Sequence, residues 1–281
     1  MNQAEKASRL LELHHGSQLL VLVNAWDAAS AAIVEHMGFP AIATTSAGVA
    51  NALGYADGQH VPWMEMVQAV GKIARAVQVP VTADIESGFA ADVEGLKRSI
   101  EKVTEAGAVG VNLEDVRPGG RHESLFPLEE QVARIRAVRA TVETLKVHLV
   151  INARTDAFWL KGQAPDKAMQ DTLDRGKAYL EAGADCIFVP GLRDGVKIQA
   201  MVDHWKAPVN ILAGPGVPAI PELERLGIKR LSFGSGPMRA AMGLLRRICE
   251  EVKSAGTYSL MGELAVPYDE LNGLVRNHSS Q

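Results

Sequence analysis

Residues 105–113 read EAGAVGVNL and join the end of a helix to a short buried strand. The glycine in this segment is the residue that helices prefer just past their last turn, because it accepts a left-handed backbone there. The apolar run after it lacks polar–apolar alternation, which is typical of a strand buried on both faces in a parallel sheet. The same order recurs in three more segments: 35–44 (EHMGFPAIAT), 181–189 (EAGADCIFV) and 225–233 (RLGIKRLSF).

Four further apolar runs fit the strand role: residues 20–25, 79–83, 148–153 and 209–213. Between the runs lie amphipathic stretches long enough for crossover helices of about a dozen residues, including 64–77, 93–106, 128–144 and 169–182. Alternating strands and helices of this number predict an α/β fold, a single (β/α)₈ TIM barrel. The alternative is an open doubly wound sheet, but the first run is followed by NAWD (24–27) and not by a glycine-rich dinucleotide fingerprint.

The chain has 281 residues and no low-complexity linker, so we expect a single domain over residues 1–281. The barrel would occupy about residues 15–250, with a helix expected over 237–255 after its last strand. A C-terminal helical extension, about residues 251–281, is then more than a lone barrel needs. We expect this surplus segment to pack against a partner subunit.

Composition excludes several classes of protein. The formal net charge is −4, whereas a binder of nucleic acid or of anionic membranes needs a basic surface. Cys186 and Cys249 are the only cysteines, too few for a disulfide framework or a zinc cluster. No apolar run reaches the roughly 18 residues of a membrane span, and the N-terminus is polar. We therefore expect a cytoplasmic protein that binds neither nucleic acid nor membrane.

Acidic residues cluster where the predicted strands end, which is where barrel enzymes place their active sites. They are Asp57 after the second strand, Asp84 and Glu86 after the third, and Glu114 after the fourth. Carboxylates that converge need a countercharge, and Mg²⁺ (or, alternatively, Mn²⁺) held by few direct carboxylates and several waters would supply it. Any one of these acids could instead cap a helix or pair with an arginine, but the four together favour a metal site.

Candidate anion-binding residues lie at the same edge. Arg154 ends the fifth strand, and arginine binds a planar carboxylate through two hydrogen bonds; the alternative is a structural salt bridge to one of the acids. Thr45, Ser46 and Ala47 follow the second strand, where backbone N–H groups could hold a second anionic group or simply form a turn. Asn112, on the fourth strand, is a further candidate substrate contact.

The loop 116–123 (VRPGGRHE) follows the acidic end of the fourth strand. Its glycine pair and basic residues are typical of a lid over an anionic substrate, with His122 as acid or base and Arg121 as an anion contact. The alternative is a solvated surface loop. Both cysteines lie elsewhere, Cys186 in a buried strand and Cys249 on a late helix, and we interpret both as structural.

Four segments, TSAGVA (45–50, followed by Asp57), TADIESGF (82–89), NLED (112–115) and NARTDA (152–157), resemble the isocitrate lyase and phosphoenolpyruvate mutase superfamily. The resemblance runs from about residue 15 to 250. It implies a Mg²⁺-assisted (β/α)₈ barrel that acts on 2-oxo acids or their precursors through an enolate-like intermediate. It also implies a homotetramer built from dimers that exchange their last barrel helix, which would account for the surplus C-terminal segment.

The resemblance also implies roles for single residues. Asp84 would be the direct Mg²⁺ ligand, while Asp57, Glu86 and Glu114 would hold its water shell, and Glu114 would also belong to the catalytic set. Arg154 would clamp the substrate carboxylate opposite the backbone of residues 45–47.

Two departures bear on the reaction. Most relatives have aspartate where Glu86 stands, and the isocitrate-type lyases have a Lys-Lys-Cys-Gly-His lid, whereas residues 117–122 contain neither lysine nor cysteine. We therefore expect a Mg²⁺-dependent lyase or decarboxylase that cleaves a C–C bond in a small 2-oxo or 2-hydroxy di- or tricarboxylic acid. One alternative is C–P bond chemistry, as in phosphonopyruvate mutases and hydrolases or carboxyphosphonoenolpyruvate mutase. The other is a non-catalytic binder of 2-oxo acids or oxalate.

Overall fold

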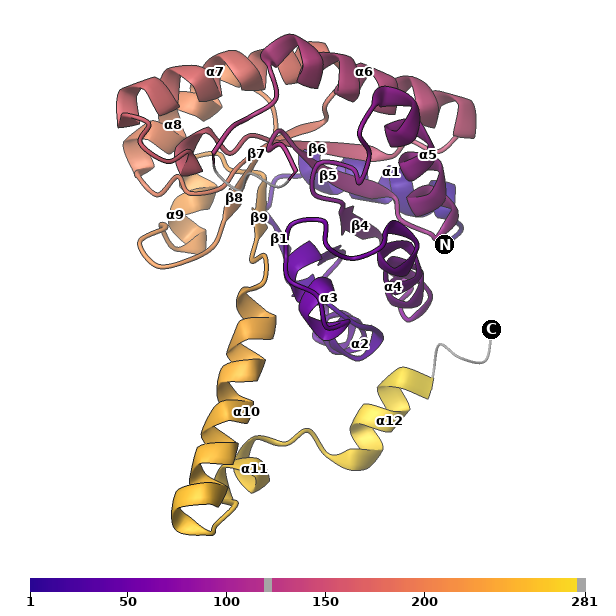
Figure 1. Ribbon diagram of the computed structural model, residues 1–281, viewed down its shortest axis with the longest axis vertical. Helices are drawn as coiled ribbons and strands as arrows, with labels where there is room; N and C mark the ends of the chain where they lie inside the picture. The colour runs from indigo at the N-terminus through magenta and orange to yellow at the C-terminus, as the bar shows by residue number, and fades with distance from the viewer. Residues whose placement is uncertain (119–122, 277–281) are drawn as a thin grey trace.

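The computed structural model describes residues 1–118 and 123–276. Within these ranges one parallel sheet contains the strands β1 (Leu20–Leu22), β2 (Asn24–Ala25), β3 (Ile42–Thr44), β4 (Val81–Asp84), β5 (Gly110–Glu114), β6 (Val150–Arg154), β7 (Cys186–Val189), β8 (Val209–Leu212) and β9 (Arg230–Ser232). Their order is β1-β9-β8-β7-β6-β5-β4-β3-β2. Since β1 and β2 are consecutive in the chain, this order brings the two ends of the sheet together (Figure 1). The prediction of an α/β fold is confirmed, with a nearly closed, barrel-like parallel sheet, and the doubly wound alternative is wrong.

Helices surround the barrel and extend from it (Figure 1). They are α1 (Gln3–His15), α2 (Ala28–His36), α3 (Ser46–Ala52), α4 (Trp63–Arg75), α5 (Val93–Glu105), α6 (Leu128–Leu145), α7 (Pro165–Glu181), α8 (Gly195–Trp205), α9 (Ile220–Arg225), α10 (Gly236–Ala255), α11 (Ser259–Leu264) and α12 (Tyr268–Arg276), with a 3₁₀ turn, η1, at Ala157–Trp159. No helix in the described ranges combines the length and the apolar character that crossing a bilayer requires.

The strand predicted over residues 20–25 is split in two at Val23. β1 pairs with β9 on one side, whereas β2 pairs with β3 on the other. The side chain of Asn24 bridges this seam: its Nδ2 donates to Thr44 O (2.7 Å), and its Oδ1 accepts from the backbone N–H groups of Phe233 (2.7 Å) and Gly234 (2.9 Å). The chain itself closes the barrel at Val23, and this amide ties together the backbone segments on the two sides of the seam.

The helix ends explain why the quoted glycines recur. Gly107 has a φ of +106°, and the N–H of Ala108 donates back to Val103 O (3.2 Å), which satisfies a carbonyl of the last helical turn. A side chain at this φ would strain the backbone. The other three glycines of the pattern also have positive φ: Gly38, Gly183 and Gly227.

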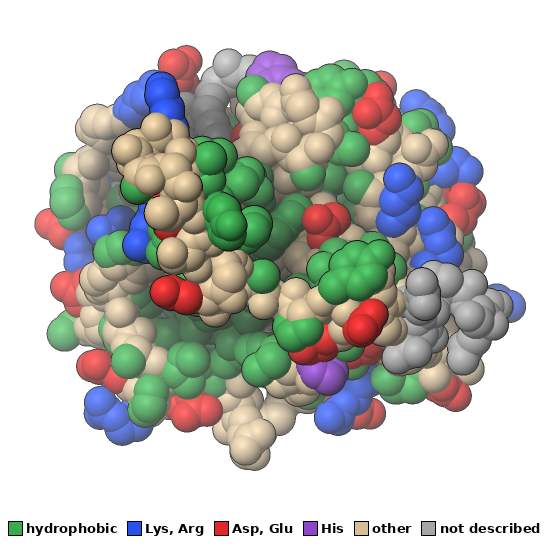
Figure 2. All heavy atoms as spheres, turned by 90° about the horizontal axis from the view of Figure 1, so that it is seen from below, with side chains coloured by type: hydrophobic (Ala, Val, Ile, Leu, Met, Phe, Trp, Pro, Cys, Tyr) green, Lys and Arg blue, Asp and Glu red, His purple; other side chains and the backbone are tan. Residues whose placement is uncertain are grey.

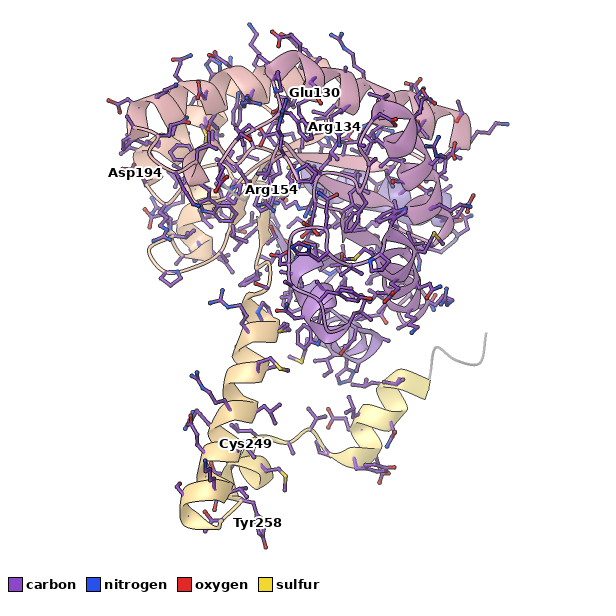
Figure 3. The ribbon with its side chains drawn as sticks, viewed as in Figure 1. Glu130, Arg134, Arg154, Asp194, Cys249 and Tyr258 are labelled. Atoms are coloured by element: carbon purple, nitrogen blue, oxygen red, sulfur yellow. The ribbon has the colours of Figure 1, made fainter. Side chains whose placement is uncertain are left out.

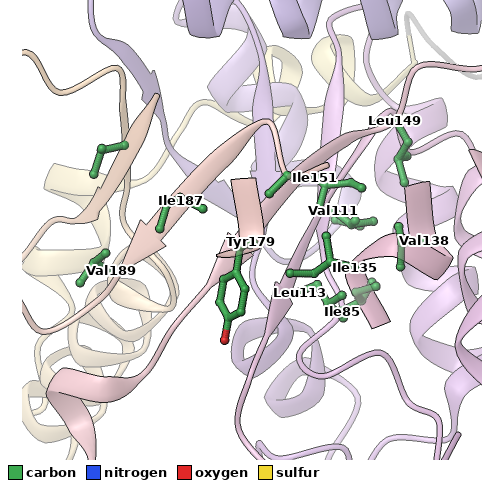
Figure 4. Close-up of a cluster of buried hydrophobic side chains, with 14 of the residues drawn as sticks. Ile85, Val111, Leu113, Ile135, Val138, Leu149, Ile151, Tyr179, Ile187 and Val189 are labelled. Carbon is green, nitrogen blue, oxygen red and sulfur yellow. The ribbon is translucent and has the colours of Figure 1, made fainter. Parts of the chain in front are cut away.

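Apolar side chains fill the layer between the sheet and its helices (Figure 4). Val111 and Ile151, on adjacent strands, belong to the same buried cluster as Val138 of α6 and Tyr179 of α7. Full burial of each such side chain contributes about 1.5–3 kcal/mol to folding, so this layer fixes the strands on which the polar residues stand. At the opposite end of the barrel α1 buries Leu10, which lies so close to Gly110 that a Cβ there would come within 2.8 Å of it.

The C-terminal helices leave the barrel as an arm (Figure 1). Met238 is the buried residue of α10, while Met242, Leu245 and Val252 are about half exposed. Seen from below, hydrophobic side chains are gathered on this face of the molecule (Figure 2). The chain then returns, because α12 contacts α2. The arm thus presents an apolar surface that the barrel does not cover.

Candidate active site

Asp84 ends β4 and is held by the segment after β3. Its Oδ2 accepts hydrogen bonds from the backbone N–H (3.1 Å) and the hydroxyl (2.8 Å) of Ser46, and its own N–H donates to Thr44 Oγ1 (2.9 Å). Its Oδ1 is buried with no hydrogen-bond partner among the described residues. A buried carboxylate oxygen left in this state costs free energy unless a ligand or cation binds it.

Ser46 is therefore engaged with Asp84 at both of its donors. Thr45 acts as the N-cap of α3, with its hydroxyl accepting from Gly48 N (3.3 Å). Residues 45–47, the expected anion-binding segment, therefore also begin α3 and hold the carboxylate of Asp84. Ala47 lines the cavity beside them.

Glu86 and Glu114 are both buried, and both lie close enough to Asp84 to be affected by its charge. Glu86 has a left-handed backbone (φ +50°) and accepts from Gln59 N at 3.1 Å. Burial, reinforced by the charge of Asp84, raises the pKa of Glu86 to about 7. Burial also raises the pKa of Glu114 well above its usual range, although Arg154 acts in the opposite direction. Burial thus disfavours the charged form of both carboxyls more strongly than the positive charge of Arg154 favours it.

Arg154 lies at the ends of the strands in the middle of the barrel (Figure 3). Its Nε and Nη2 donate to the two oxygens of Asp156 (2.6 and 2.7 Å), and its Nη1 pairs with Glu114 Oε2 at 2.8 Å. Burial disfavours its charge, but Asp156 and Glu114 outweigh this and raise the pKa of Arg154. Arg154 therefore does form structural salt bridges, the alternative considered from the sequence, because the carboxylates of Asp156 and Glu114 hold its guanidinium.

Two small cavities adjoin these residues, and Asp57 lines both. The first, about 110 Å³, contains seven of the predicted residues: Thr45, Ser46, Ala47, Asp57, Asp84, Asn112 and Arg154. The second, about 100 Å³, is lined by Asp57 together with Glu86, Glu114 and Arg117. The fold therefore brings all four predicted acids to one mouth. Arg121 and His122, the predicted lid residues, lie outside the described residues.

The donor set fits a hard cation that keeps water. No three His, Cys, Asp or Glu side chains in residues 1–118 and 123–276 converge closely enough to hold a metal by themselves. Mg²⁺ commonly takes one or two carboxylates and completes its octahedron with waters. The buried Oδ1 of Asp84 offers one direct ligand, and Asp57, Glu86 and Glu114 would accept hydrogen bonds from the waters.

The structure adds residues that sequence reasoning missed. Asp156 holds Arg154, and the ring centroids of Trp159 and Phe188 lie 5.1 and 5.6 Å from its guanidinium carbon. His60 lines the second cavity. The sequence could have indicated Asp156, because it follows Arg154 by two residues and residues two apart in an extended chain share a face. Trp159 follows the same strand closely, and an aromatic residue there is most simply a packing residue, although it could also form a wall of the pocket.

Comparisons with known proteins agree with this geometry. The family model described as phosphoenolpyruvate phosphomutase matches residues 10–253. The chain is 30% identical to a phosphoenolpyruvate phosphomutase of Streptomyces hygroscopicus, covering 95% of this chain and 86% of the relative. It is 29% identical to a 2,3-dimethylmalate lyase of Eubacterium barkeri, covering 96% and 93%.

Solved structures give the same result. A Burkholderia cenocepacia J2315 protein superposes with a TM-score of 0.89 at 32% identity, covering 96% of this chain and 95% of that one. A phosphonopyruvate hydrolase, solved in complex with oxalate and Mg²⁺, has a TM-score of 0.84 at 23% identity, covering 98% and 97%, which shows a shared fold. On the match of most of its length, the chain belongs to the isocitrate lyase/phosphoenolpyruvate mutase superfamily of enzymes.

Proposed function

We propose that this protein uses Mg²⁺ to cleave a C–C bond next to the 2-oxo group of a small dicarboxylic acid, such as an oxaloacetate-like or 2-methylmalate-like compound. The buried, unpartnered Oδ1 of Asp84 carries the proposal, because it lies in a cavity that Arg154 also lines. One group binds a cation and the other a carboxylate, and a 2-oxo acid offers the matching pair of oxygens. The phosphonopyruvate hydrolase structure that contains oxalate and Mg²⁺ supports this pairing by analogy.

The chain's own residues would hold the substrate in a defined orientation. Asp156 fixes two of the N–H groups of Arg154 and Glu114 pairs with a third, so the N–H groups that are left would bind a substrate carboxylate from a guanidinium already held in place. Glu114, bound to Nη1, would then compete with that carboxylate or move toward the metal-bound waters. When bound, Mg²⁺ supplies Lewis acidity toward the charge that develops on the 2-oxo oxygen.

Proton transfer to the carbon that keeps the bonding electrons needs an acid. His122 stays a prediction from the sequence. His60, which lines the second cavity beside Glu86 and Glu114, is a candidate within the described residues.

The size of the first cavity favours the smaller acids. Its volume of about 110 Å³ is below the roughly 300–1,000 Å³ of typical small-molecule pockets. Trp159, Phe188 and Leu212 form an apolar side of its wall, which suits a methyl or methylene group better than a third carboxylate. We therefore favour di- over tricarboxylic acids.

Similarity to a phosphoenolpyruvate phosphomutase favours a second candidate, C–P bond chemistry on phosphonopyruvate or a related compound. A non-catalytic binder of oxalate-like acids would have the same metal and anion sites without turnover. Product analysis separates these possibilities.

The experiment is a panel of 2-oxo and 2-hydroxy diacids, assayed for pyruvate, oxalate and CO₂ release with Mg²⁺ and with EDTA, beside phosphonopyruvate followed by ³¹P NMR. We expect Mg²⁺-dependent cleavage of at least one C–C substrate and its loss in Asp84→Ala. Turnover of phosphonopyruvate alone would establish the second candidate. Binding of oxalate with no turnover of any compound would refute both catalytic proposals.

We also propose that two copies exchange α10, as the family resemblance implies. The half-exposed apolar residues of α10 support this, as does a groove of about 510 Å³ between α10 and α3, which Trp26 and Met242 line. A second α10 would cover these residues. Light scattering after size exclusion tests the assembly, and a monomer at micromolar concentration would refute it.

A further inference from the structure

Arg230, the first residue of β9, is fully buried inside the barrel. Its Nη2 donates to Asn112 Oδ1 at 3.0 Å, and its Nη1 lies 3.4 Å from His14 Nε2. Burial lowers the pKa of Arg230 to about 10, so the guanidinium is still charged at neutral pH. Its two partners are an amide oxygen and an imidazole nitrogen. The positive charge of Arg230 therefore lies beneath the acidic residues at the mouth of the barrel.

The partners of Asn112 determine which way its amide points. Oδ1 accepts from both Arg230 Nη2 and Asn152 Nδ2 (2.8 Å), and these two groups can only donate. A flipped amide would set its own N–H groups against two donors. The Nδ2 group is therefore fixed on the opposite side, and Asn112 lines the first cavity, in register with Asp84 on the neighbouring strand.

His14 extends the same network to α1. Because its Nδ1 lies 2.7 Å from Leu10 O, which can only accept, Nδ1 carries the proton and Nε2 is left to accept from Arg230. His14 is thus held as the neutral tautomer, and the positive charge of the network stays on Arg230.

We propose that Asn112 donates a hydrogen bond from Nδ2 to an oxygen of the bound dicarboxylate, and that Arg230 acts as a positioning residue that fixes and polarises this amide. The inference rests on the proposed function and names a specificity contact for it. A donor backed by a buried cation binds an anionic oxygen more strongly than a neutral amide alone. It also faces the ligand from the floor of the barrel, whereas Arg154 faces it from the rim.

The test is the binding of oxalate by isothermal titration calorimetry at saturating Mg²⁺, together with thermal unfolding. Asn112→Asp keeps the shape of the side chain and its acceptor for Arg230, but places a negative charge where the ligand oxygen would lie. We expect oxalate affinity to fall by at least about tenfold while the melting temperature rises, since Arg230 gains a carboxylate partner. Opposite movement of binding and stability is a result that a purely structural role would not produce.

Asn210→Asp is the matched control. Asn210 is buried in the barrel and accepts from Ser232 Oγ (3.1 Å), and it pairs in register with Arg230 but does not line the cavity. The same added charge there should change oxalate affinity by no more than about threefold. Equal losses in the two variants, or unchanged binding in Asn112→Asp, would overturn the inference, as would absence of oxalate binding by the wild type.

Arg230→Met tests the positioning role, and Arg230→Lys is its conservative counterpart. We expect oxalate binding to weaken in the first and to recover in part in the second, which keeps the charge. This test is independent of the test of the proposed function. If the wild type binds oxalate and the variants weaken binding as described, but no acid is cleaved, only the proposed function is refuted.

Discussion

Replacement of His14 by glutamine should change how the stability of the protein depends on pH. His14 is buried against Leu10 O and Arg230, and burial followed by the nearby charge of Arg230 lowers the pKa of His14 to about 3. In the unfolded chain its pKa is about 6.5. Between these two pKa values the unfolded state binds a proton that the native state does not bind. The contribution of His14 to the free energy of unfolding is therefore complete above pH 6.5 and is lost as the pH falls toward 3.

The size of the effect follows from the two pKa values. At pH 5 the unfolded imidazole is almost fully protonated and the native one is not, which lowers the free energy of unfolding by about 2 kcal/mol relative to pH 7.5. This figure depends little on the native pKa, provided that it lies well below 5. Glutamine does not titrate, so His14→Gln should lack this loss even though it lowers stability at every pH through poorer packing.

The measurement is urea unfolding at pH 7.5 and pH 5 for the wild type, His14→Gln and the control His15→Gln. His15 is the exposed neighbour on the same helix, so its replacement controls for the loss of a histidine side chain that is not buried. Comparing the variants cancels the contributions of the other buried acids. If the wild type loses no more stability between the two pH values than His14→Gln does, His14 is not held neutral in the native state.

Three more substitutions test other parts of the structure. Asp156→Asn removes a charge and one acceptor from the arginine fork, so oxalate affinity in calorimetry should fall by about tenfold, as loss of a hydrogen bond to a charged group implies. Gly191→Ala would place a Cβ 2.5 Å from Trp159 Nε1 at a φ of +83°, so it should lower the free energy of unfolding by about 1–3 kcal/mol, whereas Gly214→Ala, with open space around it, should be nearly neutral. Leu245→Glu charges the exposed face of α10, and light scattering should show a smaller assembly than the wild type at the same concentration.

The barrel could be predicted because its signals are local. Each strand is a buried apolar run, and the glycine after each of several helices marks the turn before it. The helix predicted over 93–106 is observed as Val93–Glu105, and the one over 237–255 as Gly236–Ala255. The short helix α3 was missed because seven residues show too little periodicity, whereas the end of α9 was marked by Gly227.

The site was predictable only in part. Asp57, Asp84, Glu86 and Glu114 meet because parallel strands end at one edge, a consequence of topology that the sequence pattern contains. Their partners depend on side-chain directions that the pattern does not contain. Only the structure shows that Asp156 binds Arg154 and that the ring of Trp159 lies beside it. The same holds for the orientation that Arg230 gives to the amide of Asn112.

One residue links the seam of the barrel to the wall of the site. Asn24 makes three hydrogen bonds to backbone groups, one on the strand that leads into residues 45–47 and two on the segment 233–234, and both of these segments border the first cavity. Its amide is thus engaged on both sides of the seam, so it lines the cavity while offering little free hydrogen-bonding capacity to a ligand. β1 pairs with β9 and β2 with β3, and the Asn24 bonds add a direct link between the cavity walls on the two sides of Val23. Replacement of Asn24 should therefore disturb the lining of the first cavity as well as the packing of the seam.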